Sequence, residues 1–291
     1  MNHRHDKTAL VVEGGAMRGI FAAGVLDHFI EAEFNPFQLV IGVSAGSVNA
    51  AAYLSKQKGR NFKVFTDYSL RPEYISWKKF LKGGHLMDLD WSWEITSRDL
   101  PIDLDTLFAS RVDFEIGVTR NSDGQSIFIQ PNVENISHLM KASCTVPLFY
   151  RKFLKINQEI VSDGGVAAPI PVQRAIEKGA SKIMVIRSRP DSFRMKKGME
   201  SKLGAFLFRK HPGLVAALHN RPNTYNASID LIHNPPQKLK VVDVCPPEDF
   251  KTKRFTQDYQ TLLTDYELGK EMGRIAIEKW NLVQEVSETQ I

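Results

Sequence analysis

The sequence predicts a three-layer α/β fold, with helices on both faces of a mainly parallel β-sheet. The first observation is the order of elements, because strand-like runs at residues 8–13 and 39–43 alternate with helix-like stretches at 17–29 and 45–54. Parallel strands need a crossover connection, so a β-α-β-α order is typical of a parallel sheet covered by helices. The second is composition: 43% of the 291 residues are hydrophobic and 24% are charged. This balance supports a sizeable core.

The first two strands and helices follow from local patterns. Thr8–Glu13 is a β-branched apolar run that ends at Gly14-Gly15, which predicts a buried strand and a tight turn. From Met17 to Phe29, apolar residues recur at spacings of one, three and four, as on the core-facing stripe of a helix. Leu39–Val43 is predicted as the second strand. Residues 45–54, rich in small helix formers, are predicted as the second helix.

The rest of the chain continues as one unit. Residues 61–111 predict a mostly helical excursion, and the runs at 112–119 and 126–130 flank a turn-rich cluster, which predicts a hairpin. Short strands are expected at 160–161, 183–186 and 239–244, and a long helix at 261–283. No internal repeat or Gly/Ser/Pro-rich linker divides the chain. We expect a single domain over 1–291, with its core motifs in 8–190 and a helical and strand part in 191–291.

Charge and cysteine content restrict the function classes only broadly. The formal net charge of +5 suits an anionic surface without choosing between phospholipid and nucleic acid. Cys144 and Cys245 lack ligand spacing, so a reduced interior without metal or other cofactor is expected. Glu13 and Arg18 interrupt the first apolar stretch before it reaches signal-peptide or membrane-span length. We expect a cytoplasmic protein whose membrane contact is peripheral, and the sequence predicts no oligomeric state.

The segment 191–221 interleaves basic and apolar residues and carries much of the positive excess. One interpretation is an ordinary solvated helix with a core-facing stripe. The other is a basic amphipathic element that lies on a phospholipid surface or covers the site.

A candidate nucleophile stands between the second strand and the second helix. Gly42-Val-Ser44-Ala-Gly46 is a G-x-S-x-G pattern at a strand-turn-helix elbow. Such an elbow holds the serine in a strained conformation, and the flanking glycines remove side chains that would clash in the turn. The start of the following helix adds partial positive charge near a developing oxyanion. A plain Gly-rich turn has the same pattern, so the motif alone does not decide.

The first strand ends in a second Gly-rich turn, Gly14-Gly15-Ala16-Met17-Arg18-Gly19. A dinucleotide-binding turn would need a third glycine where Ala16 stands and an acidic residue at the tip of a second strand, and neither is present. A turn whose backbone N–H groups point outward can instead hold a tetrahedral oxyanion. With Ser44 on the neighbouring strand end, the oxyanion interpretation is the better one.

A nucleophilic serine needs a base. Eight histidines are present, and none sits in a motif that marks a triad member. Ser162-Asp163-Gly164-Gly165 follows an apolar pair, so Asp163 is placed at the end of another strand. A plain Asp-Gly turn is the alternative interpretation of that segment.

Together these pieces resemble the patatin-like phospholipase family. Its Gly-rich turn, G-x-S-x-G elbow and downstream D-G-[GA] correspond to residues 13–19, 42–46 and 163–165, and Ala142–Pro147 resembles its A-S-x-x-x-P segment. The resemblance covers roughly residues 8–190. It implies a patatin-like fold and a serine lipid acyl hydrolase of phospholipase A or esterase type.

The resemblance also implies the roles of the site residues. Ser44 would attack an ester and Asp163 would accept its proton, as a Ser-Asp dyad. The N–H groups around Gly14, Gly15 and Ala16 would stabilise the oxyanion, with Arg18 at the family's basic position and Gly19 closing the turn. Gly42, Gly46, Gly164 and Gly165 would support the motifs. The expected substrate is a phospholipid or another fatty acyl ester, with contact to anionic membrane and no nucleic-acid partner.

Two residues depart from the family pattern. Glu13 replaces an aspartate outside the chemistry. Ala16 replaces a glycine, and if that position requires a positive φ, the methyl group costs about 1 kcal/mol or reshapes the turn.

Two other functions compete with this hypothesis. A conventional Ser-Asp-His α/β-hydrolase esterase would use His211, His219 or His233, although its elbow normally follows several strands and Ser44 follows only one. A non-catalytic nucleotide- or acyl-binding regulatory module would use the Gly-rich turn without hydrolysis.

Overall fold

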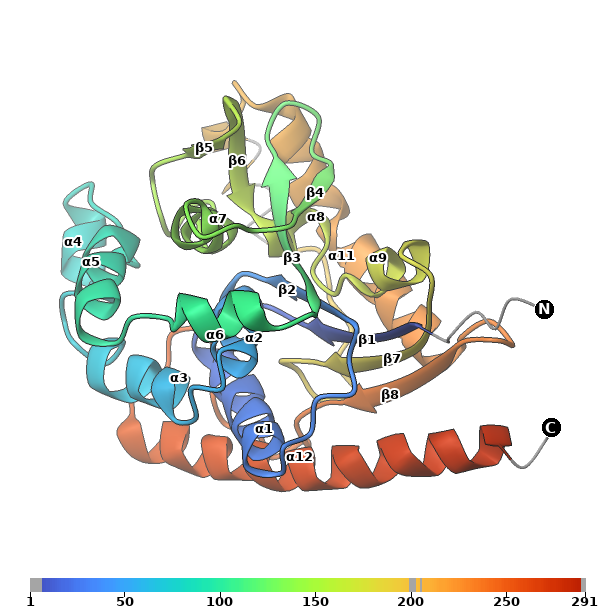
Figure 1. Ribbon diagram of the computed structural model, residues 1–291. Coiled ribbons are helices and arrows are strands. Elements are labelled where there is room, and N and C mark those ends of the chain that lie inside the picture. The colour runs from blue at the N-terminus through green and yellow to red at the C-terminus, as the bar shows by residue number, and fades with distance from the viewer. Residues whose placement is uncertain (1–6, 199–202, 205, 289–291) are drawn as a thin grey trace.

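The strands of the computed structural model, which describes residues 7–198, 203–204 and 206–288, form one mixed, mainly parallel sheet with helices on both faces (Figure 1). In this described part, eight strands pair in the order β5-β6-β3-β2-β1-β7-β8, with β4 also paired to β3. They are β1 (Lys7–Val12), β2 (Leu39–Val43), β3 (Asp113–Arg120), β4 (Ser126–Ile129), β5 (Leu154–Ile156), β6 (Glu159–Asp163), β7 (Ala180–Ile186) and β8 (Lys240–Val244). The α/β class predicted from the sequence is confirmed.

The helices connect and cover these strands. They are α1 (Gly19–Glu31), α2 (Ala45–Leu54), α3 (Arg60–Lys63), α4 (Trp77–Leu81), α5 (Leu89–Asp99), α6 (Leu104–Ala109), α7 (Ile136–Ser143), α8 (Gly164–Ala167), α9 (Val172–Glu177), α11 (Pro212–His233) and α12 (Tyr259–Glu288). A 3-10 turn, Ala16–Arg18, precedes α1, and a π-helical turn, Val64–Tyr68, follows α3. Strand β2 and helix α2 have the bounds that the sequence predicts, and the expected hairpin is β3-β4.

Hydrophobic core covers both faces of the sheet, and the central strand β1 is therefore buried on both sides. Leu10 and Val12 face the layer of α1, α2 and α12, whereas Ala9 and Val11 face the layer of α9 and α11. All four side chains are fully buried. A strand covered on both faces needs apolar residues at every position, which explains the unbroken apolar run in the sequence.

Strand register brings the ends of β1, β2 and β6 to one edge of the sheet. Val12 pairs with Gly42 in the parallel pair β1-β2, so the turn after β1 lies beside the turn after β2. Val43 pairs with Gly117 on β3, which continues beyond this edge. The antiparallel strand β6 pairs with that extension and places Asp163 opposite Val118. The position after Val43 and the end of β6 therefore flank β3 at the same level.

The segment 191–221 differs from the single solvated helix that the sequence allowed. Residues 193–198 have no regular secondary structure, and α11 begins only at Pro212. The backbone of Met195 is instead held by the Asn226 side chain, which accepts its N–H at 2.8 Å and donates to its carbonyl at 3.0 Å. Lys202 lies outside the described residues. Leu203, Phe206 and Leu207, which belong to the same segment, are exposed.

The described helices include none with the length and apolar character needed to cross a bilayer.

Candidate active site

Ser44 stands at a strained turn between β2 and α2. Its backbone angles are φ 53° and ψ −134°, and α2 begins at the next residue, Ala45. An L-residue rarely adopts this region, because its Cβ crowds the backbone, and such strain is typical of functional sites. The geometry is that of a nucleophile elbow.

Hydrogen bonds hold both the backbone N–H and the backbone carbonyl of Ser44. Its N–H donates to Ser143 Oγ at 2.8 Å, and Ser143 Oγ donates in turn to the Gly117 carbonyl at 2.7 Å. Its carbonyl accepts from Ser47 N–H at 2.9 Å and from Ser47 Oγ at 2.7 Å. These buried contacts fix the backbone on which the hydroxyl is mounted, and they offset the strain of the turn.

Close backbone approach explains the glycines at the elbow. A Cβ on Gly46 would lie 2.3 Å from the Val12 carbonyl oxygen, so α2 can pack against β1 only with glycine there. A Cβ on Gly14 would lie 2.6 Å from Ser44 Cβ. The Gly-rich turn after β1 is therefore pressed directly against the serine.

The turn after β1 presents unused backbone donors. Within the part of the chain that the structure describes, the N–H groups of Gly14, Gly15 and Ala16 donate no hydrogen bond. Ala16 has φ 51°, so the position does adopt the positive φ that favours glycine. Arg18 is buried at the end of the 3-10 turn, and Gly19 begins α1. The three N–H groups can donate hydrogen bonds to a negative oxygen that develops next to Ser44.

Asp163 ends β6 with its carboxyl group buried beside Ser44. Its Oδ1 accepts the N–H of Gly165 at 2.7 Å, and Gly164 begins the short helix α8. Among the described residues, no partner makes a regular hydrogen bond to the buried Oδ2. Burial raises the pKa of this carboxyl; the Ser44 hydroxyl is the largest opposing influence, and the positive charge of Arg221 follows.

The last residue of α7 and the turn that follows it support both Ser44 and Asp163. Ser143 holds the Ser44 N–H, and the Thr145 carbonyl accepts the Asp163 N–H at 3.1 Å. On the other side, Thr119 Oγ1 donates to the Asp163 carbonyl at 2.8 Å. The segment 143–145 therefore sets the spacing between the serine and the aspartate.

An apolar cavity of about 270 Å³ opens at Ser44. It runs between α2, the helical excursion 60–104 and α7. Most of its surface is apolar, with lining residues that include Val48, Phe65, Met87, Leu104 and Met140. A cavity of this shape and lining suits a fatty acyl chain.

A second cavity of about 40 Å³ shares Ala16, Ser44 and Val146 with the first. Its other lining residues include Asp163 and three arginines, Arg18, Arg221 and Arg254. The two cavities meet at Ser44: the first is lined mainly by apolar residues, whereas the second also carries charged side chains.

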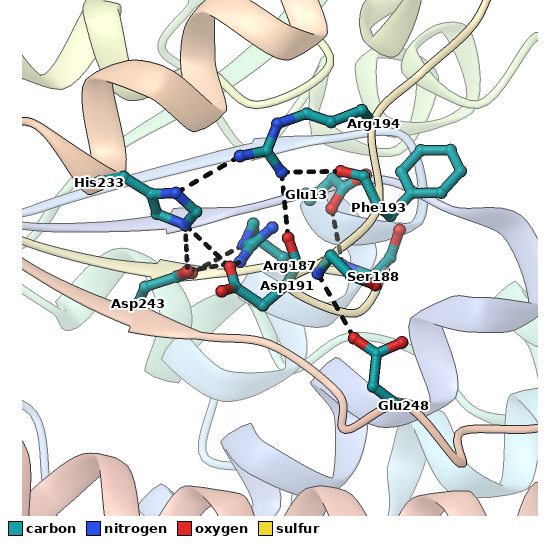
Figure 2. A network of polar contacts seen from close by, with 10 residues as sticks. Glu13, Arg187, Ser188, Asp191, Phe193, Arg194, His233, Asp243 and Glu248 are labelled. Carbon is teal, nitrogen blue, oxygen red and sulfur yellow. Dashed lines mark hydrogen bonds and ion pairs between the residues drawn. The ribbon is translucent and has the colours of Figure 1, made fainter.

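The histidines that could complete a triad lie elsewhere. No described histidine lines either cavity. His219 is exposed on α11, and the ring of His211 packs against Phe153. His233 bonds to Asp191 at 2.8 Å in a network around Arg187 behind the Gly-rich turn (Figure 2).

Glu13 belongs to the support of the Gly-rich turn. Its Oε2 accepts the N–H of Ser188 at 2.6 Å, which ties the end of β1 to the loop after β7 (Figure 2). Burial raises the pKa of Glu13, and the Ser188 N–H and Arg18 oppose that shift. The departure from the family's aspartate thus lies outside the reacting groups.

Comparisons with known proteins identify the family. A family model described as patatin-like phospholipase matches residues 10–176, and a second, for a domain of unknown function (DUF6363), matches 211–283. The uncharacterized protein YjjU of Escherichia coli K12 is 35% identical over 275 residues, covering 92% of this chain and 76% of that protein.

Two solved structures are similar at 12% identity. VipD from Legionella pneumophila has a TM-score of 0.48, covering 94% of this chain and 67% of that one. The type III effector protein ExoU has a TM-score of 0.41, covering 95% and 54%. The chain belongs to the patatin-like phospholipase family.

Proposed function

We propose that this chain is a serine lipid acyl hydrolase of phospholipase A or esterase type, in which Ser44 and Asp163 form a catalytic dyad. The observation that carries the proposal is their joint position. A serine on a strained elbow lies beside a buried carboxyl group and at the mouth of an apolar cavity. Family membership supports an acyl ester as the substrate.

The geometry supports a two-step reaction. Ser44 Oγ attacks the ester carbonyl carbon while Asp163 accepts the hydroxyl proton, and the N–H groups of Gly14, Gly15 and Ala16 donate hydrogen bonds to the oxyanion. The C–O bond to the alcohol then breaks, and the alcohol leaves with the proton from Asp163. Water attacks the acyl-Ser44 ester with Asp163 again as base. The fatty acid leaves, and the proton returns to Ser44.

Burial suits Asp163 to this role. A base works best when its pKa lies near the working pH. Desolvation raises the pKa of the Asp163 carboxyl group toward that range. The free Oδ2 is the atom that would receive the proton, since Oδ1 is bound to Gly165 N–H.

The test is hydrolysis of a lipid panel by the wild type, Ser44→Ala and Asp163→Asn, together with labelling by a fluorophosphonate probe. We expect labelling only with Ser44 present. Asp163→Asn should reduce kcat by about a hundredfold to ten-thousandfold. Replacement of His211, His219 and His233 should leave activity in place. Loss of activity with a histidine replacement and not with Asp163→Asn would favour a triad, and a folded wild type without labelling would favour a binding module.

We also propose peripheral contact with anionic membrane through the exposed apolar residues Leu203, Phe206 and Leu207, which lie next to Arg209 and Lys210. Gly204 of this segment approaches Leu218, which lines the small cavity, so the segment lies near the site. Binding should be stronger on anionic than on neutral vesicles, should fall with salt and should weaken in Phe206→Ser. Equal sedimentation with both vesicle types would contradict this contact.

A further inference from the structure

Three arginines gather in the small cavity at Ser44. Arg18, Arg221 and Arg254 all line it, and we call them the cationic subsite. The only acidic residues in its described lining are Glu13 and Asp163. Each of these carboxyl groups already accepts a backbone N–H, and burial raises the pKa of both. Among the described lining residues, three arginines therefore stand beside two carboxyl groups.

Arg18 is the buried member of the three, whereas Arg221 and Arg254 are partly exposed. The Arg18 side chain is only 5% exposed, and its Nε is buried without a hydrogen-bond partner among the described residues. Burial, together with the charges of Arg189 and Arg254, lowers its pKa to about 9, and the opposing influence of Glu13 is smaller. A buried cation among like charges is costly unless an anion joins it. The environment of Arg18 thus indicates that a negatively charged ligand binds here.

The other two arginines come from the last third of the chain. Arg221 lies on α11, where its Nε donates to the Gly165 carbonyl at 2.7 Å. Arg254 lies in the loop after β8. Its backbone carbonyl accepts the Met17 N–H at 3.4 Å, and its guanidinium lies over the Phe149 ring. Both lie outside residues 10–176 and inside 211–283, so the second family region completes a site that the first begins.

We propose that the cationic subsite binds the phosphate group of a glycerophospholipid on the alcohol side of the scissile ester. The proposal rests on the proposed function. The apolar cavity takes the acyl chain, Ser44 meets the ester, and the guanidinium groups meet the phosphate, which lies a few bonds from the ester in such lipids. Guanidinium forks match the oxygen geometry of phosphate and bind it through paired, charge-assisted hydrogen bonds.

The test compares two substrates with identical acyl chains, dioctanoyl phosphatidate and dioctanoylglycerol, in the same neutral detergent micelles. The wild type should prefer the phosphatidate. In Arg254→Gln the ratio of the two kcat/KM values should fall about tenfold to hundredfold, and Arg254→Lys should retain part of the preference. Taking a ratio cancels any general effect of the substitution on Asp163.

Arg274→Gln is the matched control, because it removes one exposed arginine from α12, where it pairs with Glu271 and Glu278. Its ratio should equal that of the wild type. If Arg254→Gln and Arg221→Gln both fold, by circular dichroism, and keep the wild-type ratio, the subsite assignment is overturned.

Calorimetry with glycerol phosphate and inorganic phosphate, on Ser44→Ala with and without Arg254→Gln, separates this proposal from the hydrolase proposal. Weaker binding in the double variant supports the subsite even if no ester is cleaved. Ester cleavage without phosphate binding overturns the subsite alone. Binding of both anions without a preference for phosphatidate assigns the site to a free phosphate compound and overturns its role in substrate choice.

Discussion

Replacing Ser44 by glycine and, separately, by alanine distinguishes the hydroxyl's chemistry from the backbone strain of the elbow. Both variants lose the nucleophile, so both should lose acyl hydrolysis. They differ in Cβ, which alanine keeps at φ 53° and ψ −134° and glycine lacks. Glycine tolerates this region, whereas a residue with a Cβ is strained there.

The expected difference follows from two opposing terms. Strain in a sparsely populated region costs about 1–3 kcal/mol, and glycine's extra freedom in the unfolded chain costs about 0.5–1 kcal/mol. Ser44→Gly should therefore be more stable than Ser44→Ala by about 1 kcal/mol, or about 2 °C in Tm. Urea and thermal unfolding, followed by circular dichroism, measure the difference.

Ser97 supplies the matched control, since it is exposed near the end of α5, where the backbone is helical. There the order should reverse, with Ser97→Ala about 1 kcal/mol more stable than Ser97→Gly. If alanine were the more stable replacement at both serines, the elbow would not store the strain that we infer.

Three further results are expected. Ser143→Ala removes the hydroxyl that links the Ser44 N–H to the Gly117 carbonyl, and should lower kcat about tenfold and the free energy of unfolding by about 1–3 kcal/mol; unchanged kinetics would refute its supporting role. Asp163 must be deprotonated to act as base, and burial raises its pKa, so kcat/KM should rise with pH along a limb above the ordinary aspartate value of 3.8. Arg221→Gln should move that limb to higher pH, and a limb at the ordinary value would contradict the assignment. Val48→Phe should fill part of the apolar cavity and shift preference to shorter acyl chains in a nitrophenyl ester series, whereas an unchanged chain-length profile would exclude this cavity as the acyl site.

Much of the fold could be predicted from the sequence, because its central strands carry their own signal. Val11 and Ile41 lie in strands buried on both faces, so the apolar runs stand out from their surroundings. The segment 193–198 carries no comparable signal. Its conformation depends on Asn226, which is 31 positions from Met195 and can be paired with it only once α11 has packed.

In the candidate site, too, some residues have a local sequence signal and others are placed only by tertiary contacts. The elbow at Ser44 is local, so its strand, turn and helix can be read from adjacent residues. Whether Ala16 adopts a positive φ could not be predicted from the sequence, and the structure gives φ 51° there. The roles of Ser143, Arg221 and Arg254 depend on tertiary contacts. Ser143 lies in a segment that resembles a family motif, which could have indicated it, whereas no local pattern marks the two arginines.

The support of both residues of the proposed dyad by segment 143–145 has a consequence for folding. Ser143 and Thr145 reach Ser44 and Asp163 from a part of the chain that is 99 positions from the serine. Contacts of such high sequence separation close large loops and form late in folding. The catalytic geometry therefore cannot mature in an early intermediate that contains only β1, β2 and their helices. During refolding, esterase turnover should appear with the last structural phase, which makes activity a reporter of complete folding.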